Sequence, residues 1–103
     1  MIDLDPAVGH EIQKTRPCIV VTSDSYNANN WVIVVVPLTS KAMAQYDQVL
    51  ILPPEGGLKS PSVTLPDQLT AIDRSRMRRK LGRLTSGKML QIDLSLKAVL
   101  DLP

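Results

Sequence analysis

The stretch Trp31-Val32-Ile33-Val34-Val35-Val36-Pro37-Leu38 decides the fold. Its run of β-branched residues, closed by a proline, favours an extended strand over a helix. Because the run is apolar at both odd and even positions, both faces of this strand are predicted to be buried. We therefore expect residues 31–38 to form the central strand of a sheet.

Other segments share the β-branched character of this run. Prolines recur through the first two thirds of the chain, where they remove backbone donors and disfavour helix before them. The predicted strands cover residues 17–22, 31–38, 48–52, 62–72 and 80–84. The strand over 62–72 is the longest of these, and it carries Asp67 and Gln68 in its middle.

The C-terminal segment changes to helical spacing. Thr85 or Ser86 is a suitable N-cap, and apolar residues then fall on one helix face: Met89, Ile92, Leu96, Val99 and Leu100. Strands followed by one helix predict a small antiparallel sheet or half-open barrel with the helix packed on it. We expect one domain over residues 1–103, mainly β with a C-terminal α-helix.

The composition narrows the possible functions. A chain of 103 residues with one histidine and one cysteine is not expected to build a zinc site or an internal disulfide. Cys18 is predicted to be a core residue. The acidic N-terminus and the lack of a long apolar run predict neither a signal peptide nor a membrane span. We therefore expect a cytoplasmic protein without a metal or other cofactor.

Basic residues are unevenly distributed, although the formal net charge is only +2. Half of the 12 lysines and arginines lie close together: Arg74, Arg76, Arg78, Arg79, Lys80 and Arg83. Such a cluster is suited to a phosphate backbone. It is equally compatible with a solvated surface turn, so the cluster alone does not decide between the two interpretations.

Four motifs follow one another along the chain. They are Asp5-Pro6-Ala7-Val8-Gly9-His10-Glu11 with Arg16-Pro17, then Pro37-Leu38-Thr39-Ser40, then Asp67-Gln68-Leu69-Thr70-Ala71-Ile72-Asp73, and finally Leu81-Gly82-Arg83-Leu84. Together they resemble the MazF/PemK/Kid toxins of type II toxin–antitoxin systems. The resemblance implies an SH3-like β-barrel with a C-terminal helix and a homodimer. It also implies a metal-independent, sequence-selective endoribonuclease that cleaves single-stranded RNA. Family members usually carry more residues before the first motif, so the first strand is expected to be short.

The resemblance also implies roles for individual residues. Arg16 would stabilise the charge of the transition state, and Thr39 would donate its hydroxyl to a phosphate oxygen. His10 would transfer a proton or orient the phosphate. Asp67 would act as general base, or would instead hold the Arg16 loop or the dimer through a salt bridge. The expected RNA-binding residues are Glu11, Lys14, Ser40, Gln68, Tyr26, Asn27 and Arg76, although residues 23–30 are also compatible with an ordinary polar turn.

Two other functions stay open at the level of sequence. Gyrase-inhibiting toxins share this fold but rely on a C-terminal Trp-Gly-Ile, whereas this chain ends Leu100-Asp101-Leu102-Pro103. An inactive barrel that binds RNA or an antitoxin is the other alternative. The resemblance further implies a cognate antitoxin with a disordered acidic–hydrophobic segment that folds onto the toxin. No membrane partner is expected.

Overall fold

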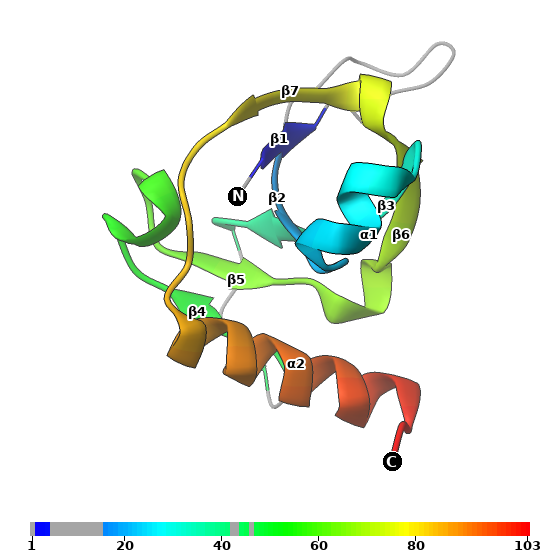
Figure 1. Cartoon of the computed structure of the whole chain (residues 1–103). Helices are drawn as coiled ribbons and strands as arrows, with labels where there is room; N and C mark the ends of the chain where they lie inside the picture. The colour runs from blue at the N-terminus through cyan, green and yellow to red at the C-terminus, as the bar shows by residue number, and fades with distance from the viewer. Residues whose placement is uncertain (1, 5–15, 42–43, 46) are drawn as a thin grey trace, which may run out of the picture.

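A computed structural model of the chain describes residues 2–4, 16–41, 44–45 and 47–103 (Figure 1). The strands are β1 Ile2–Leu4, β2 Arg16–Val20, β3 Val32–Thr39, β4 Leu50–Ile51, β5 Ser62–Thr64, β6 Thr70–Asp73 and β7 Met77–Lys80. The helices are α1 Asp24–Asn29 and α2 Ser86–Leu100. Three short 3-10 helices are η1 Glu55–Gly57, η2 Pro66–Gln68 and η3 Arg74–Arg76.

Strand β3 organises the sheet because it pairs antiparallel with β2, β5 and β6. The hydrogen-bonded order is β4-β5-β3-β2-β1-β7, and β6 lies beside β3 off this path. Figure 1 shows the strands curving into a barrel-like ring, with α1 across its opening and α2 along one side. Within the described residues, the ladder does not close on itself. The predicted class, mainly β with a C-terminal helix on a half-open barrel, is confirmed.

The core lies on both faces of β3. Ile33, Val35, Val36 and Leu38 are each at most 2% exposed, whereas Trp31 and Val32 are 80% and 42% exposed. The prediction of a central strand is confirmed, but both of its faces are buried only in the later part of the run. One cluster contains Cys18, Ile33, Val35 and Ile72. The other contains Ile19, Leu38, Val49, Ile51, Leu58 and Ile92. Cys18 is therefore a core residue, as its neighbours in the sequence indicated.

Helix α2 begins where its capping residues predict. The Thr85 hydroxyl accepts a hydrogen bond from the Lys88 N–H at 3.1 Å. A carboxylate oxygen of Glu55 accepts from the N–H and the hydroxyl of Thr85 at 3.0 and 3.1 Å. Ile92 is 1% exposed and anchors the helix to the core, whereas Leu100, at the end of the same apolar set, is 46% exposed. No helix in the described ranges has the length and apolar character needed to cross a membrane.

The predicted strand over residues 62–72 is wrong. Pro66 has no N–H for a strand ladder, and the chain turns into η2 between β5 and β6. Asp67 and Gln68 therefore lie on an exposed 3-10 turn instead of the middle of a strand.

Two other local predictions differ from the structure. The last strand, β7, ends at Lys80, so the strand predicted over residues 80–84 is displaced towards the C-terminus. Residues 23–30, expected to form an RNA-selecting loop or a polar turn, contain helix α1, whose first turn is capped by the Ser23 hydroxyl accepting from the Tyr26 N–H at 3.2 Å.

Two glycines allow the η1 turn to cross the segment that joins β7 to α2. Gly57 has a φ of +76°, and a Cβ placed there would collide with the carbonyl oxygen of Leu81. A Cβ on Gly82 would lie 2.8 Å from the carbonyl carbon of Gly56. The two segments can therefore approach this closely only because both positions lack a side chain.

Replacing Gly57 by alanine tests this crossing. The Gly57→Ala variant is expected to lose about 2 kcal/mol or more of its free energy of unfolding, from the positive φ and the collision with Leu81. Gly87→Ala is the matched control, because Gly87 lies in α2 with nothing within 4 Å of an added Cβ. The control is expected to gain up to about 1 kcal/mol. Urea unfolding measures both, and equal stability of Gly57→Ala and the unchanged protein would contradict the crossing.

Candidate functional site

Arg16 and Thr39 lie at the same end of the β2–β3 hairpin. Arg16 is the first residue of β2, and Thr39 is the last residue of β3. The antiparallel pairing of the two strands reaches as far as Cys18 opposite Pro37, so Arg16 and Thr39 each lie two residues beyond that pair. Both side chains line one groove of about 520 Å³, so the structure brings the two predicted catalytic residues together.

The hydroxyl of Thr39 is held in a defined environment. It accepts a hydrogen bond from the backbone N–H of Lys41 at 3.2 Å. Because a hydroxyl has one donor hydrogen and two acceptor lone pairs, the hydrogen of Thr39 stays available for another oxygen. Ser40 lines the same groove beside it. The groove can thus offer a guanidinium and two hydroxyls to one bound anion.

Three more cations line this groove, and sequence reasoning did not select them as site residues. They are Lys41, Lys59 and Arg79. Arg79 belonged to the basic cluster. Nothing in the sequence around Lys59 indicated a site, because the fold of the loop between η1 and β5 brings this residue to the groove. The groove has no acidic residue among its described lining. Four clustered positive side chains without a carboxylate create a field that attracts phosphate groups.

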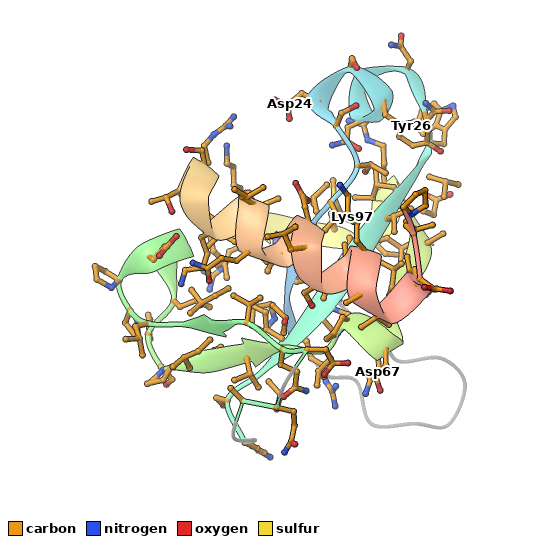
Figure 2. The ribbon with its side chains drawn as sticks, turned by 90° about the horizontal axis from the view of Figure 1, so that it is seen from below. Asp24, Tyr26, Asp67 and Lys97 are labelled. Atoms are coloured by element: carbon orange, nitrogen blue, oxygen red, sulfur yellow. The ribbon has the colours of Figure 1, made fainter. Side chains whose placement is uncertain are left out.

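Other predicted site residues lie away from this groove. Asp67 and Gln68 are exposed on η2, and neither lines the groove. Figure 2 shows Asp67 well separated from Tyr26, which lies 42% exposed on α1. Arg76 lies on η3 and is half-buried. His10, Glu11 and Lys14 lie outside the described residues.

Asn27 is occupied by contacts within the protein. Its side-chain carbonyl oxygen accepts from the Thr22 hydroxyl at 2.5 Å, and its amide nitrogen donates to the Thr22 carbonyl at 3.0 Å. The Thr22 hydroxyl in turn accepts from the Val34 N–H at 3.4 Å. Both polar ends of Asn27 therefore hold α1 against the β2–β3 hairpin. This geometry gives no support to the prediction that Asn27 reads an RNA base.

Metal-binding residue types are scattered in the described part of the chain. No group of three His, Cys, Asp or Glu side chains there is close enough to hold a metal ion together. The described lining of the Arg16 groove supplies guanidinium groups, ammonium groups and hydroxyls. Such groups bind anions and stabilise negative charge that develops on them.

Comparison with known proteins identifies the class to which this fold and groove belong. Residues 1–100 match the family described as PemK-like, MazF-like toxin of type II toxin-antitoxin system. The chain belongs to this family, as the four sequence motifs predicted.

Individual relatives and solved structures match this chain over almost its whole length. The chain is 37% identical over 107 residues to Endoribonuclease MazF9 of Mycobacterium tuberculosis, covering 98% of this chain and 91% of that protein. Mycobacterium tuberculosis toxin MazF-mt6 shares the fold with a TM-score of 0.82 at 19% identity, covering 100% and 99% of the two chains. The MazE-MazF structure (Form-II) from Deinococcus radiodurans has a TM-score of 0.78 at 26% identity, covering 99% and 90%.

The contacts of Asn27 lead to a prediction about stability. Asn27→Ala is expected to lower the free energy of unfolding by about 1–3 kcal/mol, because the partly buried polar groups of Thr22 lose their partners. Tyr26→Ala is the neighbouring control on the same helix, and it should cost less because Tyr26 is more exposed. Thermal unfolding of both variants measures the difference. A stable Asn27→Ala protein with weakened RNA binding would instead favour the base-reading role.

Proposed function

We propose that this chain is an endoribonuclease toxin that cleaves single-stranded RNA in a sequence-selective manner without a metal. The observation that carries this proposal is the groove in which Arg16 and Thr39 lie together among further cations. Family membership supports it, as does the name endoribonuclease of the 37% identical relative. RNA as the substrate also implies action in the cytoplasm.

The reaction we propose uses the substrate's own nucleophile. The ribose 2′-oxygen attacks the adjacent phosphorus, the bond from phosphorus to the 5′-oxygen breaks, and a 2′,3′-cyclic phosphate and a 5′-hydroxyl are formed. Because the nucleophile is intramolecular, the protein mainly positions the phosphate and stabilises its added charge. The Arg16 guanidinium can contact two phosphate oxygens at once, and the Thr39 hydroxyl can donate to one of them.

Two protons must move in this reaction. The 2′-hydroxyl loses one, and the departing 5′-oxygen gains one. The described lining of the groove contains neither a carboxylate nor an imidazole. We therefore assign proton transfer to His10, because histidine is the side-chain type that ordinarily titrates near neutral pH. Asp67 is the weaker candidate for the general base, since its exposed turn does not line the groove.

We propose that the toxin acts as a homodimer and is inhibited by a cognate antitoxin. The MazE-MazF structure at 26% identity supports a protein partner of this kind. Exposed leucines offer apolar surface for such contacts on β4, along α2 and after it: Leu50, Leu52, Leu90, Leu94, Leu100 and Leu102. An acidic antitoxin segment would also be attracted to the cations of the groove.

Cleavage in the presence of EDTA tests the proposed activity. The protein is expected to cut a diverse single-stranded RNA pool and to leave DNA of the same sequences intact, because DNA lacks the 2′-hydroxyl. Arg16→Ala should reduce the single-turnover rate by about 100-fold or more, through lost transition-state stabilisation. Lys97→Ala is the control, since it removes an exposed cation on α2 that does not line the groove. Absence of cleavage across the pool, or full activity of Arg16→Ala, would refute the proposal.

Lys59 is expected to bind substrate and to leave the chemical step unchanged. Lys59→Ala should raise KM with little change in kcat, because a phosphate neighbouring the scissile one loses a cation. The slope of log affinity against log salt for single-stranded RNA should fall by about 0.7. Lys97→Ala again serves as the control, and salt titrations of RNA binding provide the measurement. Identical slopes for the two variants would show that Lys59 contacts no phosphate.

A further inference from the structure

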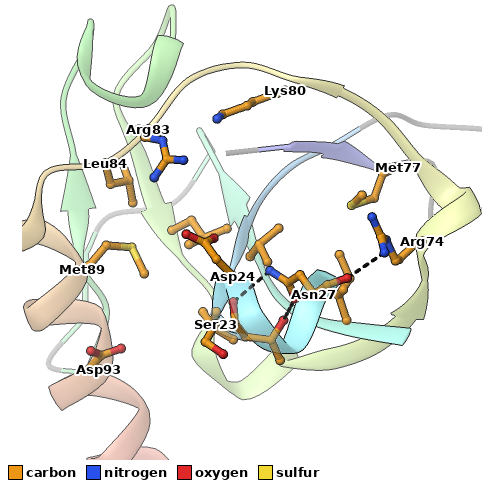
Figure 3. Close-up of a pocket in the computed structure, with 15 residues that line it drawn as sticks. Ser23, Asp24, Asn27, Arg74, Met77, Lys80, Arg83, Leu84, Met89 and Asp93 are labelled. Atoms are coloured by element: carbon orange, nitrogen blue, oxygen red, sulfur yellow. Dashed lines mark hydrogen bonds between the residues drawn. The ribbon is translucent and has the colours of Figure 1, made fainter. Parts of the chain in front are cut away.

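A second cavity lies at the opening of the barrel-like ring (Figure 3). Its volume is about 450 Å³, which falls within the range of about 300–1,000 Å³ that is usual for small-molecule sites. Side chains from β2, α1, η3, β7 and α2 contribute to its walls. The cavity and the Arg16 groove share no lining residue. They come close along the chain where Lys80 of the cavity follows Arg79 of the groove.

Charged groups of opposite sign line this cavity from different elements of the fold. Lys80 at the end of β7 and Arg83 beyond it supply cations, and Asp24 at the start of α1 supplies a carboxylate. Figure 3 shows the Lys80 and Arg83 side chains entering from the β7 side, with the Asp24 carboxylate projecting from α1. Among the described residues, the side chains of these three make no hydrogen bond or ion pair with one another or with a neighbour. Their charges are therefore available to a ligand. Asp93 adds a second carboxylate from α2.

The floor between these charges is apolar. Ile33 and Val21 contribute branched aliphatic surface, while Met77 and Met89 contribute thioethers. Methionine side chains adapt to flat rings and make favourable contacts between sulfur and an aromatic face. A planar heterocycle with an anionic group at one end and hydrogen-bond donors at the other would match this arrangement of walls and floor.

The wall that carries Asp24 is held in place without using Asp24. An Arg74 guanidinium nitrogen donates to the backbone carbonyls of Asn27 and Asn30 at 2.7 and 3.3 Å. The Asn27 side chain is bonded to Thr22 at both polar ends. Helix α1 is therefore fixed to β2 and η3 before any ligand arrives. Preformed walls lower the ordering cost of binding.

We infer that this cavity is a nucleotide-binding pocket, separate from the Arg16–Thr39 groove, that takes a guanosine phosphate. The phosphate would lie against Lys80 and Arg83, which supply charge-assisted hydrogen bonds. The base would lie on the methionine-lined floor. The Asp24 carboxylate would accept from the ring N–H and the exocyclic amino group of guanine, a pair of donors that uracil lacks. The ligand is either a free guanosine nucleotide or one guanosine of an RNA strand.

Calorimetric titration of the full chain with GMP, guanosine and UMP tests the inference. GMP is expected to bind saturably below about 1 mM, and more tightly than guanosine or UMP. Asp24→Asn should weaken GMP by about tenfold and leave UMP unchanged, because only the guanine contact is lost. The double variant Lys80→Ala/Arg83→Ala should abolish the advantage of GMP over guanosine. Lys97→Ala, which removes an exposed cation that does not line the cavity, should bind GMP as the unchanged protein does.

Competition with RNA identifies the source of the nucleotide. A guanosine-containing RNA blocked by 2′-O-methyl groups should be displaced by GMP if the pocket takes a guanosine of the strand. If the pocket takes a free nucleotide, GMP and this RNA should bind together. Arg16→Ala should keep GMP binding in both cases, so a failure of the proposed nuclease activity would be visible separately. The inference would be overturned if GMP at about 1 mM did not bind and if Asp24→Asn and the double variant bound RNA as tightly as the unchanged protein.

Discussion

The pairing of β2 with β3 is the constraint on which the candidate site depends. The register that sets Cys18 against Pro37 is held by side chains buried on both faces of β3. A slip of one residue would turn the apolar side chains towards the wrong face of the sheet. The same strand register therefore determines both the packing of the core and the position of the site residues. In the native register, Arg16 at the start of β2 and Thr39 at the end of β3 line one groove. Burial of residues such as Val35 and Ile19 thus positions polar groups that are themselves exposed or half-buried.

The walls of the groove depend on a second constraint, the crossing of η1 with the segment after β7. Gly57 and Leu81 line the groove as well as forming this crossing, and Glu55 fastens the same turn to Thr85 at the start of α2. The C-terminal helix therefore stabilises the groove indirectly, through a cap and a glycine contact. This arrangement places Lys59 and Arg79, which come from different segments of the chain, in the lining of the same groove.

Much of the fold can be predicted from the local sequence, and the predictions that were wrong failed for physical reasons. The strand predicted from the β-branched run at 31–38 has bounds within one residue of those of β3. The helix predicted to start at Thr85 or Ser86 corresponds to α2, which starts at Ser86. The strand predicted over 62–72 failed because Pro66 outweighs the apolar residues around it. Helix α1 was missed because its asparagines are poor helix formers, and the Thr22–Asn27 contacts that hold it are tertiary.

The site was predictable to the extent that its residues lie in motifs. Arg16, Thr39 and Ser40 meet as the family resemblance implied. Lys59 could not be found in this way, because only the path of the chain brings it to the groove. Asp67 was misplaced for the same reason as its strand, since a 3-10 turn presents side chains differently from a ladder.

The most direct measurement of the central claim is a crystal structure of the protein with an RNA whose scissile 2′-hydroxyl is methylated. The account predicts that the scissile phosphate lies between Arg16 and Thr39, with the guanidinium and the hydroxyl at hydrogen-bonding distance, about 3 Å, from its oxygens. An RNA bound with that phosphate in another part of the molecule, and with Arg16 and Thr39 contacting none of the substrate, would contradict it.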